Sequence, residues 1–591
     1  MEEVTLTIDN IQVTVPNGST VLDAAKAAGI YIPTLCYLEG VHKAGACRVC
    51  VVEVQGGRGL QASCVYPVSD GMVVRTNTER VRKARRMVVE LMLSAHRKEC
   101  TVCGRSLNCE LQAVAKRVGV DESRFEGAMP KTVVDTSSPS IVRDSSKCIL
   151  CRRCVTVCRE VQGVGALFPV GRGFETAVVP ALEKQLSEIA CTMCGQCITV
   201  CPVNALYEKD STKEVWSALN DPNKHVVVQT APAVRVAIGE EFGLPAGTRV
   251  TGKMVAALRR LGFDKVFDTD FTADLTIIEE GHELLGRLTK GGTLPMITSC
   301  SPGWIKFIEH FYPDLLPHLS TCKSPQQMFG ALAKSYYAEK MGLKPEDIYV
   351  VSVMPCTAKK YEAQRSEMSV NNGLPDVDAV LTTREAAKMI REMGLDFANL
   401  PDEKHDEPFG ISTGAGVIFG STGGVMEAAL RTVYEVVTKQ DLPKLDFEEV
   451  RGLEGVKEAV VKIGDLDVKV AVANGLSNAK KLMDKVAAGE ADYHFIEIMA
   501  CPGGCLGGGG QPIPTTDEVR KARMRAIYEE DAGLPLRKSH DNPAVKALYE
   551  EFLGEPNSHK AHELLHTHYT KREKYPECED IFVEIEDASF V

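Results

Sequence analysis

The sequence predicts a multidomain fold of mixed α+β and α/β character, for three reasons. The chain has 591 residues, which is too long for one hydrophobic core, so we expect roughly three to five domains. Of its 21 cysteines, 15 precede residue 210 and stand in tight groups. Residues 210–591 instead alternate strand-like and helical runs, which is typical of parallel sheets covered by helices.

The composition is that of a globular protein, with 44% hydrophobic and 25% charged residues. A net charge of −12 does not favour non-specific binding to nucleic acid. No apolar run approaches the ~18 residues of a membrane span, and the acidic start Met1-Glu2-Glu3 is unlike a signal peptide. We therefore expect a soluble cytoplasmic protein with no membrane partner, in which clustered cysteines bind metal rather than form disulfides.

The first expected domain covers residues 1–78. Residues 4–15 alternate apolar and polar around Asp9-Asn10, which predicts a β-hairpin, and residues 20–29 predict a short helix. Four cysteines follow with the spacing C-x10-C-x2-C-x13-C, on a loop of small residues that lets backbone N–H groups face a cluster. Zinc also accepts four cysteines, but the long first spacing favours an iron–sulfur cluster. The predicted ligands are Cys36, Cys47, Cys50 and Cys64.

The second region, residues 79–125, begins with a predicted helix from Arg80 to Ala95 and continues with the pattern H-x3-C-x2-C-x5-C. A lone histidine is more often an exposed polar residue than a ligand, but its place just before three clustered cysteines reverses that expectation. Imidazole in place of a thiolate makes a cluster less negative, and net charge is one determinant of the reduction potential. The predicted ligands are His96, Cys100, Cys103 and Cys109.

The third region, residues 126–209, contains an internal repeat. The pattern C-x2-C-x2-C-x3-C occurs twice, with starting points 43 residues apart. This is the two-cluster ferredoxin pattern, in which the fourth cysteine of each run ligates the other cluster. One predicted 4Fe-4S ligand set is Cys148, Cys151, Cys154 and Cys201, and the other is Cys191, Cys194, Cys197 and Cys158.

The fourth region, residues 210–591, places cysteines on three separate loops. Strand-like runs occur at 226–228, 293–298 and 348–353, with helical runs at 254–261 and 329–341 between them. Cys300 and Cys356 each follow one of these runs, and the loop 500–512 holds Cys501, Cys505 and six glycines. Ordinary buried cysteines would explain any one loop. Four cysteines on three loops, downstream of so many clustered cysteines, favour one more buried cluster.

These three loops resemble the signature loops of the iron-only (FeFe) hydrogenases, T-S-C-C-P-x-W, M-P-C-x-x-K-x-x-E and M-A-C-x-G-G-C. The upstream patterns resemble the iron–sulfur modules of the large iron–sulfur subunit of complex I, so the resemblance covers essentially the whole chain. It implies an N-terminal β-grasp ferredoxin-like domain, small iron–sulfur modules and a large α/β hydrogenase domain with a C-terminal tail. The implied cofactors are one 2Fe-2S cluster, three accessory 4Fe-4S clusters (one His-ligated) and an H-cluster, a 4Fe-4S cubane joined to a di-iron unit with CO and CN ligands.

The resemblance also implies roles for single residues. Cys356, Cys501 and Cys505 would ligate the cubane, with Cys505 as the bridge to the di-iron unit. Further residues would line or shape the pocket, with Lys359 and Ala233 on the CN-bearing face and Met354, Met499, Pro325 and Gln326 around it.

One departure from the family lies at Cys300-Ser301, where two adjacent cysteines are usual. Ungapped alignment puts Cys300 at the proton-relay position and Ser301 at the fourth cubane-ligand position. Alternatively the loop shifts, so that Cys300 ligates and Ser301 relays protons. The sequence leaves both readings open.

Residues 275–287 predict a helix with Glu280, Glu283 and Arg287 on one face. A solvated charged face is the ordinary explanation, but buried carboxyl groups can pass protons. Glu279 and His282 lie off that face and are expected at the surface. By the resemblance, the proton path comprises Cys300, Glu280, Ser320, Glu283 and Arg287.

The C-terminal segment contains His562, His566 and His568, and near its end Cys578. A second metal site is conceivable, but we expect His562 and His566 on an exposed amphipathic helix. The acidic residues 577–587 are a candidate contact surface for a partner.

We interpret the chain as a hydrogenase that catalyses 2 H⁺ + 2 e⁻ ⇌ H₂ and is fed by a chain of iron–sulfur clusters. Because no nucleotide-binding fingerprint is evident, NAD(P) linkage would require flavin-containing companion subunits, with ferredoxin as another electron partner. H-cluster maturation proteins are also expected partners. Alternatives are the catalytic subunit of an electron-bifurcating NAD(P)-dependent complex, and an H₂-sensing or iron–sulfur assembly protein of the same fold. The loops around Cys300, Cys356 and Cys501 disfavour a complex I subunit.

Overall fold

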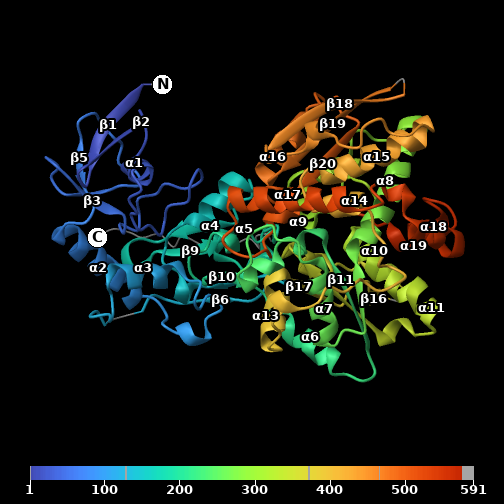
Figure 1. Cartoon of the computed structure of the whole chain (residues 1–591), viewed down its shortest axis with the longest axis horizontal. Coiled ribbons are helices and arrows are strands. Elements are labelled where there is room, and N and C mark those ends of the chain that lie inside the picture. Colours follow the sequence, from blue (N-terminus) through green and yellow to red (C-terminus); the bar gives the residue numbers. More distant parts are fainter. Residues whose placement is uncertain (1, 127–128, 371–372, 465, 576–591) are drawn as a thin grey trace, which may run out of the picture.

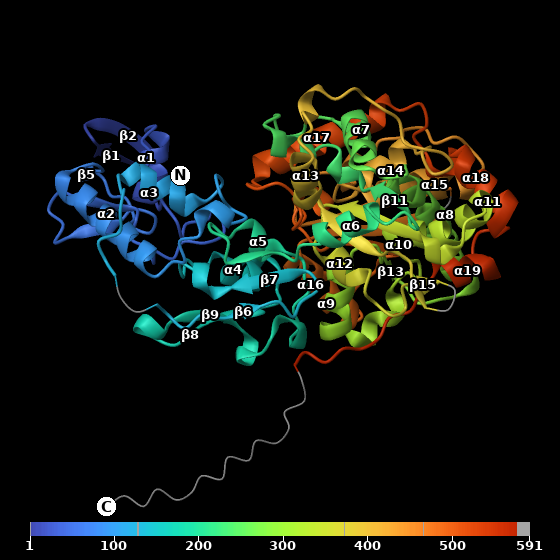
Figure 2. The ribbon, with the colours of Figure 1, turned by 90° about the horizontal axis from the view of Figure 1, so that it is seen from below.

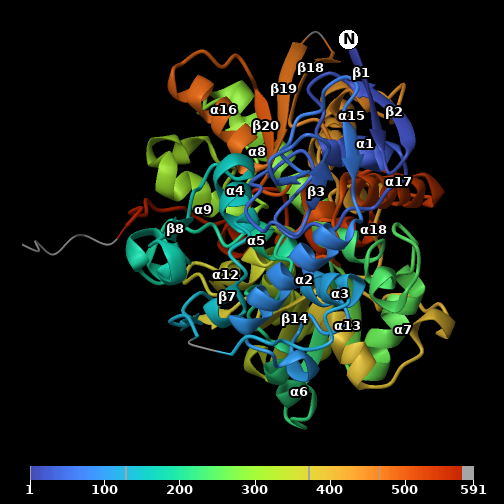
Figure 3. The ribbon, with the colours of Figure 1, turned by 90° about the vertical axis from the view of Figure 1, so that its left-hand side faces the viewer.

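The cysteine-rich N-terminal region and the α/β region occupy opposite ends of the molecule (Figure 1). The computed structural model describes residues 2–126, 129–370, 373–464 and 466–575. Helices α4 (Arg153–Thr156) and α5 (Gln196–Thr199) lie where the two regions meet (Figure 2). Seen from the N-terminal end, the cysteine-rich region lies in front of the α/β region (Figure 3). The cysteine groups therefore follow one another along the molecule toward the α/β region.

The N-terminal domain is a five-stranded sheet with one helix. Its hairpin forms as predicted, because Asp9 and Asn10 both adopt positive φ and turn β1 (Glu3–Ile8) into β2 (Ile11–Pro16). Helix α1 (Val21–Ala27) begins at a capping box between Thr20 and Asp23. The sheet order is β2-β1-β5-β3-β4, with β3 (Val51–Val54), β4 (Leu60–Ala62) and β5 (Val73–Arg75).

Two small modules follow this domain. The predicted helix at 80–95 is α2 (Glu79–Ser94), which packs against α3 (Glu110–Val118), and Arg85 of α2 donates to the Val51 carbonyl of the first domain at 2.8 Å. The ferredoxin-like module has a three-stranded sheet of β10 (Leu206–Glu208), β7 (Ile141–Asp144) and β6 (Val134–Asp135), and a hairpin of β8 (Leu167–Val170) and β9 (Ala177–Pro180). His42 joins the first domain to this module, since its Nδ1 lies 2.7 Å from Thr156 Oγ1 and its Nε2 lies 3.1 Å from the Cys151 carbonyl.

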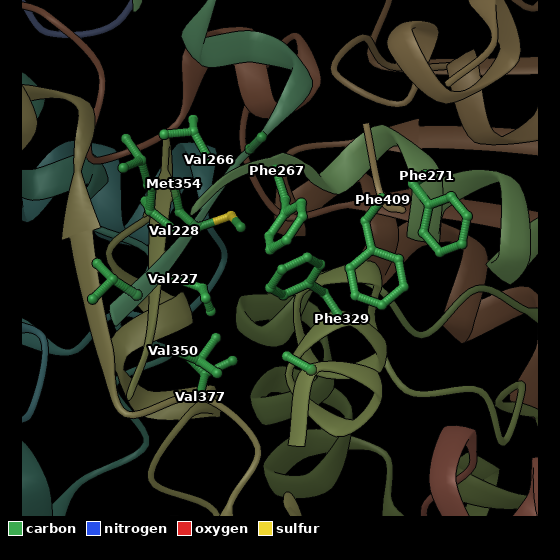
Figure 4. Packing of buried hydrophobic residues seen from close by; sticks show 14 of the residues in the cluster. Val227, Val228, Val266, Phe267, Phe271, Phe329, Val350, Met354, Val377 and Phe409 are labelled. Carbon is green, nitrogen blue, oxygen red and sulfur yellow. The ribbon is translucent and has the colours of Figure 1, made fainter. Parts of the chain in front are cut away.

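The α/β region contains a parallel four-stranded sheet in the order β12-β11-β14-β17. Its strands are β11 (His225–Thr230), β12 (Lys265–Asp268), β14 (Ile348–Met354) and β17 (Ala379–Thr382). Because helices cover the sheet, its strands are runs of buried residues rather than alternating ones. In this core Val227, Val228 and Val350 lie beside a cluster of aromatic rings that includes Phe267, Phe329 and Phe409 (Figure 4).

A second sheet has the order β13-β20-β19-β18, with β13 (Met296–Ile297), β18 (Val456–Ile463), β19 (Leu466–Asn474) and β20 (Phe495–Met499). The strand predicted at 293–298 is thus only two residues long, and Pro295, just before it, has no N–H to add to a ladder. The helix predicted at 329–341 is α10 (Pro325–Leu332), which continues through a π-helix (Ala333–Tyr337) into α11 (Ala338–Met341).

Long helix α8 (Thr269–Lys290) runs between the two sheets' hydrophobic cores and carries residues of both. The other helices of this region are α6 (Thr212–Leu219), α7 (Thr251–Leu261), α9 (Pro302–Phe311), α12 (Ala358–Glu362), α13 (Thr383–Glu392), α14 (Gly414–Ile418), α15 (Gly424–Thr438), α16 (Leu476–Ala487), α17 (Asp517–Gly533), α18 (Pro543–Leu548) and α19 (His559–Leu565). A short hairpin is formed by β15 (Ser369–Val370) and β16 (Leu374–Pro375).

The predictions that place Glu279 and His566 at the surface are wrong. Glu279 is fully buried, because this stretch of α8 is covered on every side, and His282 is only partly exposed. His566 is buried as well, because α19 ends at Leu565 and the next residue forms a bridge with Cys322, while His562 is exposed as expected. Cys578 and the acidic segment 577–587 lie outside the described residues. Within the described ranges, none of the helices is both long and apolar enough to cross a lipid bilayer.

Candidate cluster sites and proton path

The four cysteines of the first domain are all buried at one place. The sulfur atoms of Cys50 and Cys64 are 3.4 Å apart. The side chains of Cys36 and Cys47 are in contact, which lowers the pKa of the Cys36 thiol and raises that of the Cys47 thiol. Sulfur atoms from loops far apart in sequence thus converge, as ligands of one small cluster must.

His96 is buried, and its Nδ1 atom has no hydrogen-bond partner among the described residues. An orphaned ring nitrogen is unusual in a protein interior and fits a metal ligand. Cys100, Cys103 and Cys109 follow on the segment between α2 and α3, with Cys100 exposed and the other two partly exposed. Arg105 of this segment donates to the Cys201 carbonyl at 2.6 Å, so the segment lies on the ferredoxin-like module.

The ferredoxin-like module contains two cavities. One is lined by Cys148, Cys151, Cys154 and Cys201, and the other by Cys158, Cys191, Cys194 and Cys197. These are the two ligand sets that the repeat predicts, including the exchange of the fourth cysteine. Burial raises the pKa of the Cys148 thiol to about 11 and that of Cys151 to about 12. Thiolates at these positions therefore need a cation beside them, which an iron–sulfur cluster supplies.

A larger cavity lies at the carboxyl ends of β14 and β20, with a volume of about 80 Å³ against about 30 and 20 Å³ for the two ferredoxin cavities. The predicted residues that line it are Cys300, Ser301, Pro325, Gln326, Met354, Cys356, Lys359, Met499, Cys501 and Cys505. Apart from these sulfur and polar side chains, the wall of the cavity is apolar. The sulfur donors and the larger volume both fit a cluster with an additional unit.

Ala233 is the one predicted pocket residue that is not on the cavity wall. Ala231 and Pro232 occupy the wall instead. Ala233 is buried one residue further on, where its carbonyl accepts a hydrogen bond from Gln511 at 3.1 Å.

The glycines of the loop 500–512 serve mainly backbone packing. A Cβ atom on Gly508 would lie 2.1 Å from the Pro355 carbonyl oxygen, and one on Gly509 would lie 2.3 Å from the Cys194 carbonyl oxygen. Gly504, which lines the cavity, has φ +78°, and a Cβ there would lie 2.7 Å from the Thr422 nitrogen. The absence of side chains thus lets three loops approach one another closely around the cavity.

Cys300 and Ser301 face different surroundings. Burial raises the pKa of the Cys300 thiol well above its usual value, and the nearby Glu280 and Cys505 contribute further. Ser301 precedes α9, and its Oγ accepts a hydrogen bond from the N–H of Ala500, next to Cys501, at 3.2 Å. Of these two residues, Cys300 is therefore the one whose thiol is affected by the charge of Glu280 on α8.

Three of the predicted proton-path residues, Arg287, Glu283 and Ser320, are joined by hydrogen bonds. Arg287 Nη2 lies 2.6 Å from Glu283 Oε1, and Ser320 Oγ donates to Glu283 Oε2 at 3.1 Å. Glu280 is 3% exposed, and burial raises the pKa of its carboxyl group to about 8. The Ser320 hydroxyl partly offsets this rise, because a hydrogen bond to the carboxylate lowers the pKa. Arg287 is partly exposed and Glu280 is buried, and the charge of Glu280 adds to burial in raising the pKa of the Cys300 thiol at the cavity.

The last ferredoxin loop touches the cavity directly. Cys194 is common to the linings of the large cavity and of one ferredoxin cavity. Gln196 donates to the Gly507 carbonyl at 2.8 Å, and Thr357 donates to the Met193 carbonyl at 2.8 Å. The two sites are therefore separated by little more than one cysteine-bearing loop, a short distance for an electron.

Sequence reasoning missed several residues at the site. Phe419 and Gly420 line the cavity, and the glycine-rich stretch 414–424 around them could have drawn attention to them. Thr269 and Ala273 of α8 also line it, but no local signal distinguishes them from core residues. Cys322 lies near the two path glutamates without belonging to any cysteine pattern.

Comparison with known families agrees with this arrangement. Residues 224–509 match the model of the iron-only hydrogenase large subunit, C-terminal domain, and residues 517–572 match the iron hydrogenase small subunit. Residues 1–79 match a 2Fe-2S iron–sulfur cluster binding domain. Residues 85–124 match the NADH-ubiquinone oxidoreductase-G iron–sulfur binding region, and residues 138–207 match the ferredoxin-like domain of NADH-quinone oxidoreductase subunit 3.

Individual relatives match over most of the chain. The NADP-reducing hydrogenase subunit HndD of Solidesulfovibrio fructosivorans is 58% identical over 97% of this chain and 100% of its own length. Iron hydrogenase 1 of Clostridium pasteurianum is 43% identical over 96% of this chain and 100% of its own length. A solved variant of [FeFe]-hydrogenase HydA1 from Chlamydomonas reinhardtii superposes with a TM-score of 0.56 at 48% identity, over 61% of this chain and 99% of that one. The chain is therefore an oxidoreductase that belongs to the iron-only hydrogenase family, with 2Fe-2S and complex I-like iron–sulfur modules ahead of its hydrogenase domain.

Proposed function

We propose that this chain catalyses 2 H⁺ + 2 e⁻ ⇌ H₂ as the catalytic subunit of an NADP-linked hydrogenase. One observation carries the proposal. The large cavity has Cys194 of the ferredoxin-like module on its wall, together with Cys300, whose thiol has a pKa raised by burial and by the charge of the buried Glu280. An electron route and a proton route would therefore both end at this cavity.

The cavity would hold an H-cluster. In this assignment Cys356, Cys501 and Cys505 are the cubane ligands, with Cys505 bridging to the di-iron unit, and Ser301 occupies the fourth position. When bound, the organometallic group supplies the redox chemistry of hydrogen, while the protein binds, orients and shields it. Lys359 and Gln326 would contribute polar groups to its surface, and the apolar wall that includes Met354, Met499 and Pro325 would exclude water.

The accessory clusters would form the electron route. We assign one 2Fe-2S cluster to residues 1–78, one His-ligated 4Fe-4S cluster to 79–125 and two 4Fe-4S clusters to 126–209, with the hydrogenase domain at 210–591. The convergence of Cys36, Cys47, Cys50 and Cys64, the orphaned nitrogen of His96 and the two four-cysteine cavities support these assignments. Electrons would leave this route at the loop of Cys194.

The proton route would run from solvent at Arg287 through Glu283, Ser320 and Glu280 to Cys300. Protons would pass between the carboxyl, hydroxyl and thiol groups of these residues, of which Ser320 and Glu283 already share a hydrogen bond. The raised pKa of Glu280, about 8, supports this role because a group that titrates near the working pH both accepts and releases protons readily.

The likeness to HndD, a subunit of an NADP-reducing hydrogenase, supports companion subunits that use NADP(H), for which we propose a flavin as cofactor. Ferredoxin is a second electron partner consistent with the N-terminal modules. Maturation proteins would be needed to supply the di-iron unit.

A first experiment tests the catalytic assignment. The chain is purified anaerobically with H-cluster maturation, and H₂ evolution from reduced viologen is measured together with infrared bands of CO and CN. We expect both activity and bands. In the Cys505→Ala variant the bands should be lost while the accessory-cluster signals in electron paramagnetic resonance remain. Matured wild-type protein without these bands contradicts the proposal.

A second experiment tests the NADP link. Native partners are co-purified, and H₂ evolution is measured with NADPH and with reduced ferredoxin as donors. Turnover with NADPH by the complex, but not by the isolated chain, is the expected result. If no purified assembly uses NADPH while ferredoxin alone supports turnover, the NADP link is wrong and the hydrogenase assignment stands.

A further inference from the structure

Next to the proton path, three side chains with metal-binding atoms come together from distant parts of the chain. They are Glu283 of α8, Cys322 on the loop before α10, and His566 just after α19. One carboxylate oxygen, the sulfur and one ring nitrogen all lie within 4.8 Å of one another. Cys322 and His566 are buried, and Glu283 is partly exposed.

The imidazole of His566 is already oriented as in a metal site. Its Nε2 lies 3.1 Å from Oε2 of Glu279, which is fully buried and also accepts hydrogen bonds from the Tyr549 hydroxyl and, at 2.9 Å, the Asn557 N–H. A carboxylate that holds one ring nitrogen as N–H leaves the other with its lone pair free, and most metal-binding histidines are oriented in this way. The remaining nitrogen is then Nδ1, which lies 2.7 Å from the Thr321 hydroxyl oxygen, and the same hydroxyl lies 3.2 Å from Glu283 Oε2.

The other two donors are fixed as well. Arg287, Ser320 and the backbone of Thr321 all donate to the Glu283 carboxylate, which sets its orientation. The Cys322 sulfur is fully buried and lies near the Ser320 hydroxyl. Burial and the nearby glutamates raise the pKa of this thiol well above its usual value, so a cation is needed to convert it to thiolate.

We propose that Glu283, Cys322 and His566 bind Zn²⁺, with Glu279 as the carboxylate that orients His566. One thiolate, one imidazole and one carboxylate form a donor set that suits zinc, and water can complete a tetrahedral site. Binding requires the Thr321 hydroxyl to leave Nδ1 and the three donors to move closer, since ligand atoms around tetrahedral zinc lie roughly 3.3–3.8 Å apart. The zinc ion replaces the thiol proton of Cys322, which is released to solvent.

The consequence for catalysis rests on the proton route proposed above. A Glu283 carboxylate bound to zinc no longer accepts protons that enter from solvent beside Arg287, and it no longer passes them toward Ser320. Zinc therefore inhibits hydrogen turnover without touching the clusters, and removal of zinc by a chelator restores it.

The test uses the fully matured protein, so that the cluster cysteines are occupied, with Zn²⁺ alone as the probe. Zinc K-edge X-ray absorption should show one sulfur near ~2.3 Å together with N/O ligands near ~2.0 Å. The sulfur contribution should disappear in Cys322→Ser. The affinity, measured by competition with a chromophoric chelator, should fall about 10- to 100-fold in Glu279→Gln, because that residue supports the ligand histidine. The control is His568→Ala, since His568 is exposed on the same segment and should leave the affinity unchanged.

Turnover is measured in parallel. Saturating zinc should lower H₂ evolution by wild-type protein at least 10-fold and leave Cys322→Ser unaffected. If zinc is bound by one sulfur but turnover does not fall, the zinc site is supported and its effect on the proton route is overturned. Zinc that shows two or more sulfur ligands, or a sulfur contribution that persists in Cys322→Ser, overturns the site. Neither of these last results affects the hydrogenase assignment.

Discussion

The Nζ atom of Lys359 lies 2.8 Å from Oε2 of Glu362, and both side chains are buried beside the cysteine-lined cavity. The same Nζ lies 2.8 Å from Ser324 Oγ and 3.1 Å from the Cys300 carbonyl oxygen. Three acceptors thus fix one cationic group on the cavity wall. Such a preorganised charge is the kind of group that stabilises changing charge in a reaction without reorganisation.

Replacing Lys359 by Met should lower H₂ evolution about 100-fold, because loss of one preorganised donor typically has an effect of this size. It should also destabilise the fold by about 3–5 kcal/mol, because Glu362 is left buried without its partner. The double variant Lys359→Met with Glu362→Gln separates the two effects. We expect thermal unfolding to recover in the double variant while turnover stays low. Recovery of turnover as well would mean that Lys359 only supports the fold.

Replacing Glu280 by Gln should lower turnover by about 10²–10⁴-fold, because the amide cannot carry a proton between Ser320 and Cys300. Glu280→Asp keeps the carboxyl group and should recover part of the activity. Infrared and electron paramagnetic resonance spectra of the clusters should be unchanged in both variants. A Gln variant with wild-type turnover would exclude Glu280 from the path.

The raised pKa of Glu280, about 8 against an ordinary 4.5, also predicts how stability depends on pH. The folded protein keeps this proton longer than the unfolded chain does. Stability is therefore highest below pH 4.5 as far as this group is concerned, and it falls as the pH rises toward 8. Each pKa unit corresponds to about 1.4 kcal/mol, so the total effect is of the order of a few kcal/mol. We expect Glu280→Gln to unfold at a higher temperature than wild type at pH 8.5, with a smaller difference at pH 5.5.

Replacing Cys300 by Ala should abolish turnover and leave the cubane in place, because the charge of Glu280 acts on the Cys300 thiol whereas Ser301 bonds to Ala500, next to Cys501. Replacing Ser301 by Cys should keep turnover and shift the cubane's reduction potential, since thiolate is a softer ligand than an alkoxide or hydroxyl oxygen. Redox titration followed by electron paramagnetic resonance measures both. Loss of the cubane signal in Cys300→Ala would instead make Cys300 the ligand.

Replacing Gly509 by Ala should destabilise the contact between the ferredoxin loop and the cavity, because a Cβ there would lie 2.3 Å from the Cys194 carbonyl oxygen. Overpacking of this kind typically costs about 1–3 kcal/mol. The matched control is Gly533→Ala, since a Cβ on Gly533 meets no atom within 4 Å. Thermal unfolding and the rate of reduction of the clusters by viologen should change in Gly509→Ala only. Equal behaviour of the two variants would show that this close approach is not required.

Short-range patterns in the sequence predicted much of the molecule. The hairpin at Asp9-Asn10, the helix capped by Thr20 and the helix from residue 80 depend on neighbouring residues, and all three are observed. The residues that line the two ferredoxin cavities were predictable too, because cysteine spacing limits which sulfur atoms can meet. The same holds for most of the large cavity, where Cys300, Cys356 and Cys501 follow the ends of β13, β14 and β20.

Only the tertiary structure decided which charged and polar groups are buried. Helical periodicity assigned Glu279 to the surface, but α8 passes between two hydrophobic cores and is covered on every side there. His566 looked like part of an exposed helix, but α19 ends one residue earlier and His566 pairs with Cys322, 244 residues away in sequence. Burial depends on which distant segments cover a residue, and a local pattern carries no information about them. The sequence alone thus determined the family and most of the cysteines that line each cavity, whereas long-range packing decided the surroundings of the proposed proton path and the cluster of Glu283, Cys322 and His566 beside it.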